Sequence, residues 1–143
     1  MDLLILRHGE AGRHSLSPGD SKRSLTSEGQ QEIADLSNGL KSLGIKLDSV
    51  FTSPLLRAKQ TAEIVTKSLK YKGKIEEIIS LKPEGNRLEF YSVLSTLKQD
   101  SVVLVVGHEP YLSEMISEAI SQSLQNKPQE GWYGKDTCDI YTS

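Results

Sequence analysis

The sequence predicts a single-domain α/β protein whose mostly parallel sheet is covered by helices on both faces. Continuous apolar runs at residues 2–6 and 101–106 are typical of parallel strands that are buried on both sides. Segments with helical spacing of apolar residues alternate with the strands through short joints, as in right-handed strand–helix–strand units. The 143 residues contain no internal repeat and no linker, so we expect one domain that spans residues 1–143.

Two further strands are expected at residues 48–52 and 75–81, where the apolar pattern is weaker. The first helix begins after Thr26, a favourable N-cap, and ends at Gly44. Its inner face is predicted to carry Ile33, Leu36, Leu40 and Leu43.

The remaining helices and loops are predicted from helix-capping residues, prolines and polar segments. Ser53 suits the N-cap of a second helix and Pro54 its first position. A third helix is expected at residues 86–97, and a fourth begins at Pro110 or Tyr111. Residues 12–23 read as a long polar loop, a kind of segment that is commonly functional. Near the C-terminus, Cys138 and Ile140 indicate one weak edge strand.

Composition excludes several classes of protein. The formal net charge of −2 provides no positive field for nucleic acid or for an acidic membrane surface. The single cysteine, Cys138, excludes an intramolecular disulfide framework and a cysteine-rich metal site. The first residues do not read as a signal peptide, and no apolar run approaches the roughly 20 residues of a membrane span. We therefore expect a cytoplasmic protein.

Basic side chains follow three of the predicted strands. His8 comes directly after the first strand with Arg7 before it, Arg57 lies one turn into the second helix, and His108 follows the long apolar strand. The carboxyl ends of parallel strands meet at one edge of a sheet. A single histidine or arginine in such a place is commonly structural, but the four together predict a functional site. His14, in the polar loop, is interpreted as a surface residue.

This set of residues favours phosphoryl transfer to histidine. Guanidinium groups bind phosphoryl oxygens through planar forks, and the N-terminus of the second helix adds free N–H groups. A neutral imidazole is a competent nucleophile near neutral pH. No metal site and no cofactor are expected, because two cations crowd the histidines and only Glu10 and Glu109 lie beside them. Nucleotide-binding glycine motifs and a G-x-S-x-G elbow are absent, and Cys138 has no following arginine.

Four ordered blocks carry a resemblance to a known family. They are LRHGEA at residues 6–11, RSLT at 23–26 with Gly29, SPLLRA at 53–58 with QTA at 60–62, and GHEP at 107–110. The chain resembles the histidine phosphatase superfamily, which includes the phosphoglycerate mutases, and is most similar to its short SixA-type branch of phosphohistidine phosphatases. The resemblance covers about residues 3–120 and implies a phosphoglycerate mutase-like fold.

The resemblance also implies roles for individual residues. His8 would accept the phosphoryl group on Nε2, while a backbone carbonyl holds its other ring nitrogen. Arg7 and Arg57 would bind the phosphoryl oxygens, and His108 would contact the same group. Arg23 would support the mouth of the pocket. Water would then hydrolyse the phosphoenzyme and complete the cycle.

Substrate class follows from what the chain lacks. Larger members carry an acidic proton donor after the third strand, where this chain has Glu84, either an acid or a loop charge. The chain is too short for the insertions that cap the pocket of sugar-phosphate enzymes, so the site is expected to be open to a phosphorylated protein. We expect a phosphohistidine phosphatase. The alternatives are a phosphatase for a small phosphate ester and a non-catalytic phosphate-binding domain. The sequence predicts no oligomeric state.

Overall fold

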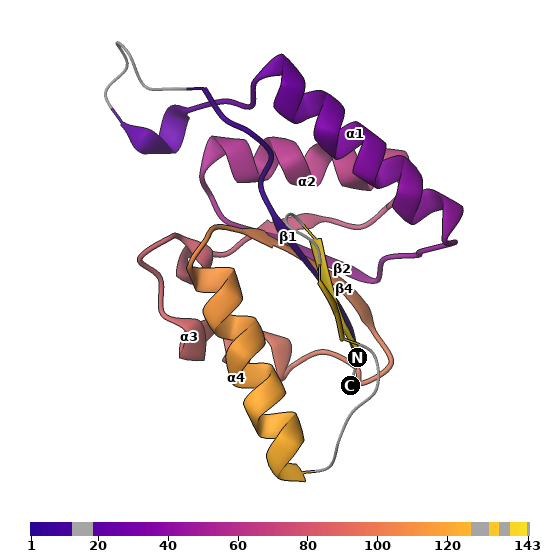
Figure 1. The fold of residues 1–143 in the computed structure, drawn as a ribbon, viewed down its shortest axis with the longest axis vertical. Helices are drawn as coiled ribbons and strands as arrows, with labels where there is room; N and C mark the ends of the chain where they lie inside the picture. Colours follow the sequence, from indigo (N-terminus) through magenta and orange to yellow (C-terminus); the bar gives the residue numbers. More distant parts are fainter. Residues whose placement is uncertain (13–18, 127–131, 135–137, 143) are drawn as a thin grey trace.

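The computed structural model describes residues 1–12, 19–126, 132–134 and 138–142, which form a six-stranded sheet between two layers of helices (Figure 1). The strand order is β3-β2-β4-β1-β6-β5. The strands are β1 (Asp2–Arg7), β2 (Ser49–Thr52), β3 (Ile75–Glu77), β4 (Val102–Gly107), β5 (Trp132–Gly134) and β6 (Cys138–Thr142). Strands β3, β2, β4 and β1 are parallel, whereas β6 runs antiparallel to both of its neighbours, β1 and β5. The predicted α/β fold class is confirmed.

The two helical layers explain the continuous apolar strands. Helices α1 (Ser27–Ser42) and α2 (Leu56–Ser68) lie on one face of the sheet, and α3 (Arg87–Leu94) and α4 (Tyr111–Asn126) lie on the other (Figure 1). Leu4 and Leu6 of β1 join the core under α1 and α2, while Ile5 joins the core under α3 and α4. Successive residues of a strand point to opposite faces, so both must be apolar. Within the described residues, no helix is long and apolar enough to cross a membrane.

The first helix begins and ends as predicted. Thr26 is the N-cap, and its hydroxyl accepts a hydrogen bond from the Gly29 N–H at 2.9 Å. Gly44 follows the helix with a φ of 72°, a conformation that favours glycine. Leu43 is an exception to the predicted inner face, because it lies at the C-cap beyond the last turn and is 70% exposed.

Two elements are shorter than predicted. The strand expected at residues 75–81 ends at Glu77 and is followed by the 3₁₀ turn η2 (Ile79–Leu81). Its partner strand β2 ends at Thr52. The last hydrogen bond between the two strands joins the Ile78 N–H to the Thr52 carbonyl, so beyond Ile78 the chain has no strand to pair with. The third helix ends at Leu94 rather than at Leu97, because hydroxyl groups of Ser95 and Thr96 bind its last carbonyl groups.

The second helix begins later than predicted. Its N-cap is Leu55 and its first residue is Leu56, so Ser53 and Pro54 lie outside it. The Ser53 N–H donates to the Val106 carbonyl and so continues the pairing between β2 and β4. Because Ser53 still belongs to the edge of the sheet, the helix starts only after the chain has turned.

The C-terminal strand is placed differently from the prediction. β6 is not an edge strand, because it lies between β1 and β5 and pairs with both. β4 pairs with one side of β1, and β6 pairs with the other side, where it satisfies backbone hydrogen-bonding groups that would otherwise be unpaired. The short β5 takes the edge position instead.

Candidate active site

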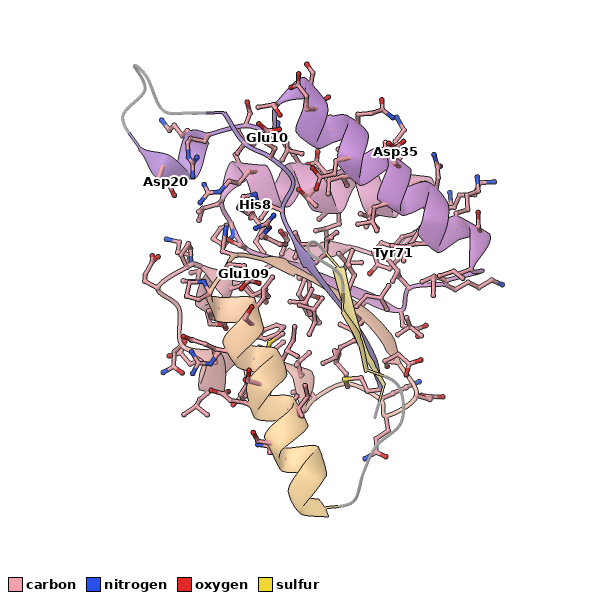
Figure 2. The ribbon with its side chains drawn as sticks, in the orientation of Figure 1. His8, Glu10, Asp20, Asp35, Tyr71 and Glu109 are labelled. Atoms are coloured by element: carbon pink, nitrogen blue, oxygen red, sulfur yellow. The ribbon has the colours of Figure 1, made fainter. Side chains whose placement is uncertain are left out.

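The carboxyl ends of the parallel strands open into a cavity of about 540 Å³. Its lining contains all five predicted site residues, and the full set is Arg7, His8, Gly9, Glu10, Asp20, Arg23, Glu32, Arg57, Pro83, His108 and Glu109. Figure 2 shows His8, Glu10, Asp20 and Glu109 gathered at this end of the sheet, with Asp35 and Tyr71 away from it. The topology therefore brings together side chains that follow different strands and lie far apart in the chain.

His8 is held in one tautomer. Its Nδ1 lies 2.7 Å from the Gly9 carbonyl oxygen, which can only accept, so Nδ1 carries the hydrogen. Its Nε2 accepts a hydrogen bond from Nε of Arg57 at 3.2 Å and therefore has the lone pair. Burial, followed by the charges of Arg57, Arg7 and Arg23, lowers the pKa of His8, although the hydrogen bond to Gly9 opposes this. The imidazole is therefore neutral near pH 7, and it lines the cavity with the lone pair of Nε2 directed at Nε of Arg57.

Arg57 is almost fully buried, with 4% exposure, although it lies outside the apolar stripe of α2. Its Nη1 donates to the Asp20 carbonyl at 2.8 Å, and its Nη2 donates to the Asp20 carboxylate at 2.9 Å. Arg23 binds the same carboxylate through Nε and Nη2, at 2.9 and 2.8 Å. The three side chains form one ion-paired group at the cavity wall.

His108 is 2% exposed, and its ring centroid lies 5.1 Å from that of His8. Its Nε2 lies 2.7 Å from the hydroxyl of Ser53, which also accepts from the Leu55 N–H at 3.3 Å. We assign the Ser53 hydrogen to this contact, which leaves the ring hydrogen on Nδ1. That Nδ1 is buried and has no hydrogen-bond partner among the described residues. Burial, with the charges of His8 and Arg57, lowers the pKa of His108 to about 3.

Close backbone packing positions the loop that carries His8. A Cβ at Gly29 would lie 2.2 Å from the Glu10 carbonyl oxygen, and a Cβ at Gly9 would lie 2.9 Å from a side-chain carbon of Ile33. The Gly9 N–H donates to the Thr61 hydroxyl at 3.2 Å. The start of α1 and the body of α2 therefore both contact the segment that follows β1, and glycine is required where α1 approaches it.

Other predicted residues differ in their placement. Arg7 is exposed at the cavity, and its side chain makes no hydrogen bond or ion pair with the described residues. Glu84 is exposed and does not line the cavity, whereas the neighbouring Pro83 does. Of residues 53–57, only Arg57 lines the cavity. His14 lies outside the described residues. Among those described, no group of three or more His, Cys, Asp or Glu side chains could hold a metal ion.

Asp20 is the main site residue that the sequence did not reveal. It lies in the 3₁₀ turn η1 (Asp20–Lys22), and the base of its loop is fixed by the hydrogen bond from the Gly12 N–H to the Ser24 carbonyl. One signal was present, because Asp20 is the only carboxylate in the polar segment 12–23. Its partner Arg57 comes from a distant helix, so the role of Asp20 was not visible in the local sequence.

Comparison with known proteins agrees with this geometry. The family model of the Histidine phosphatase superfamily (branch 1) matches residues 3–81. Phosphohistidine phosphatase SixA of Escherichia coli is 34% identical over 120 residues, which cover 82% of this chain and 73% of that protein. The chain belongs to the histidine phosphatase superfamily, and it is a phosphatase.

Solved structures agree as well. The structure of the protein histidine phosphatase SixA complexed with tungstate has a TM-score of 0.76 and 33% identity, with 82% of this chain and 76% of that chain covered. A phosphoglycerate mutase from Plasmodium falciparum has a TM-score of 0.59 at 20% identity, covering 89% of this chain and 70% of that chain. The second likeness concerns the fold alone, and it confirms the predicted phosphoglycerate mutase-like architecture.

Proposed function

We propose that this chain hydrolyses phosphohistidine on a protein substrate through a phosphohistidine intermediate on His8. The observation that carries the proposal is the fixed tautomer of His8, which leaves the lone pair on Nε2, beside Arg57 in a cavity that is also lined by Arg7 and Arg23. The similarity to SixA, a phosphohistidine phosphatase by name, supports the substrate class.

The proposed reaction has two steps. In the first, Nε2 of His8 attacks phosphorus, the P–N bond of the substrate breaks, and the departing imidazole nitrogen takes a proton from solvent. In the second, water attacks the phosphorus on His8, the P–Nε2 bond breaks, and inorganic phosphate leaves. The Gly9 carbonyl holds the proton on Nδ1 of His8 in the free enzyme, so the lone pair of Nε2 is available for attack once the phosphoryl group takes over the hydrogen bond from Nε of Arg57.

The cationic residues would stabilise the charge of the transferring group. Arg57 already donates to the nitrogen that would carry phosphorus, and Arg7 has donors that the described residues do not occupy. His108 would donate from its buried Nδ1 to a phosphoryl oxygen, which would satisfy a group that has no other partner among the described residues. Arg23 would act at the cavity wall through its contact with Asp20.

The charge of the cavity supports a protein phosphoramidate over an anionic small ester. The lining carries arginines at 7, 23 and 57, and carboxylates at Glu10, Asp20, Glu32 and Glu109. A small ester with a further negative group, such as the carboxylate of phosphoglycerate, would meet these carboxylates. A phosphohistidine leaving group can carry a proton on its own ring, and so it needs less help from a positioned acid.

A substrate panel tests the proposal. We expect kcat/KM to be highest for a phosphohistidine peptide, lower for an aryl phosphate and lowest for a sugar phosphate. Glu84→Gln should change phosphohistidine turnover little, as should the control Glu63→Gln, an exposed residue of α2 outside the cavity lining. Preference for the sugar phosphate, together with loss of that activity in Glu84→Gln, would favour the small-ester alternative. A lack of turnover with all three substrates would contradict the proposed substrate class.

The proposal extends to the setting of the enzyme. We propose that residues 1–143 act as one histidine phosphatase domain in the cytoplasm, with a phosphorylated protein as the partner. The net charge of −2 gives no support for nucleic acid or an acidic membrane as a partner. Cell fractionation followed by detection of the intact chain would test the location.

A further inference from the structure

Asp20 binds Arg57 through both its side chain and its backbone. Its carboxylate accepts from Nη2 of Arg57 at 2.9 Å, and its carbonyl oxygen accepts from Nη1 at 2.8 Å. The other carboxylate oxygen accepts from Nε of Arg23, also at 2.9 Å. Asp20 thus joins the two arginines into one unit.

These contacts use one edge of the Arg57 guanidinium. Nη1 and Nη2 face Asp20, whereas Nε, on the adjacent edge, donates to Nε2 of His8 at 3.2 Å. A guanidinium is planar and its donors point in fixed directions. Fixing the Nη edge therefore also fixes where the Nε edge points.

Burial makes this partner necessary. The side chain of Arg57 is 5% exposed and that of Asp20 is 52% exposed. A buried cation without a partner is strongly destabilising. Partial burial alone would raise the pKa of Asp20, but the hydrogen bond and charge of Arg57 and the charge of Arg23 outweigh it and lower the pKa. Asp20 is ionised near pH 7 and supplies the negative charge.

We propose that Asp20 is a positioning residue, which holds Arg57 and Arg23 so that the Nε edge of Arg57 faces the phosphoryl group on His8. The identity of that group rests on the proposed function, whereas the contacts of Asp20 do not. Asp20 acts through Arg57, because among the described residues the hydrogen bonds of the His8 ring go to Gly9 and Arg57.

A competing role for Asp20 predicts the opposite change in anion binding when its charge is removed. If the carboxylate only competed with phosphate for Arg57 and Arg23, its neutralisation would strengthen anion binding. If it positions Arg57, neutralisation weakens binding and slows the reaction. The sign of the change therefore separates the two roles.

The first test measures binding and turnover in Asp20→Asn and Asp20→Glu, with Asp35→Asn as the matched control. Asp35 lies on α1, away from the cavity (Figure 2). We expect Asp20→Asn to weaken tungstate binding and to lower kcat about 10- to 100-fold, with partial recovery in Asp20→Glu. Tungstate binding equal to or tighter than that of the wild type would overturn the proposal.

The second test measures the pKa of His8 by NMR. Release of Arg57 from Nε2 should raise this pKa in Asp20→Asn, whereas loss of the carboxylate charge alone would lower it.

A third test combines the two substitutions. In an Arg57→Lys background, Asp20→Asn should lower kcat less than about threefold. A lower pKa of His8 in Asp20→Asn would refute action through Arg57. The same conclusion would follow if Asp20→Asn lowered kcat as much in the Arg57→Lys background as in the wild type. Neither tungstate binding nor NMR requires turnover, so a wild type inactive on phosphohistidine would contradict only the proposed function.

Discussion

The buried His108 should make the stability of this protein depend on pH in a way that one substitution removes. Its pKa is about 3 in the folded protein, chiefly because of burial, against 6.5 for an ordinary histidine. At pH values between these two pKa values, His108 therefore binds a proton in the unfolded chain but not in the folded one. Because the unfolded state binds more protons, stability falls as the pH falls below 6.5.

The magnitude follows from the two pKa values. At about pH 5 the folded imidazole is still neutral, whereas the unfolded imidazole is almost fully charged. Linkage then gives a loss of about 2 kcal/mol in the free energy of unfolding relative to about pH 8. His108→Gln keeps a polar group near Ser53 but cannot gain this proton, so it should lack that part of the pH dependence.

Urea unfolding of both proteins at the two pH values measures the effect. The comparison cancels the contributions of the carboxylates, which the two proteins share. We expect the wild type to lose about 2 kcal/mol more than His108→Gln. An equal loss in both proteins, or an NMR titration of His108 near 6.5, would refute the reasoning.

Three further predictions concern the chemistry. His8→Ala should abolish turnover without unfolding the protein, and rapid quench of the wild type should find acid-labile, base-stable phosphate on His8; a label on serine or aspartate would contradict the mechanism. Arg57→Lys should lower kcat about 100-fold or more, because an ammonium cannot reproduce the planar fork that binds His8 and both Asp20 oxygens. The control is Arg87→Lys, since Arg87 forms ion pairs with Glu114 and Glu118, and it should have little effect on kcat. Activity should survive EDTA, and loss with recovery on adding Mg²⁺ or Zn²⁺ would show a metal requirement.

Much of the fold could be predicted because its signals are local. The apolar runs of β1 and β4, the Thr26 cap and Gly44 each depend on a few neighbouring residues. The convergence of His8, Arg57 and His108 also followed from order alone, since the carboxyl ends of parallel strands share an edge.

The sequence by itself determined the fold class, the family resemblance and the residue types at the strand ends. Only the tertiary structure decided the start of α2, the inner position of β6 and the partners of Arg57. Ser53 reads as a helix cap until its N–H is seen to pair with Val106. Asp20 reads as a loop charge until η1 lies against α2. Both depend on contacts between segments far apart in the chain, and such contacts leave no periodic pattern in the sequence around either residue.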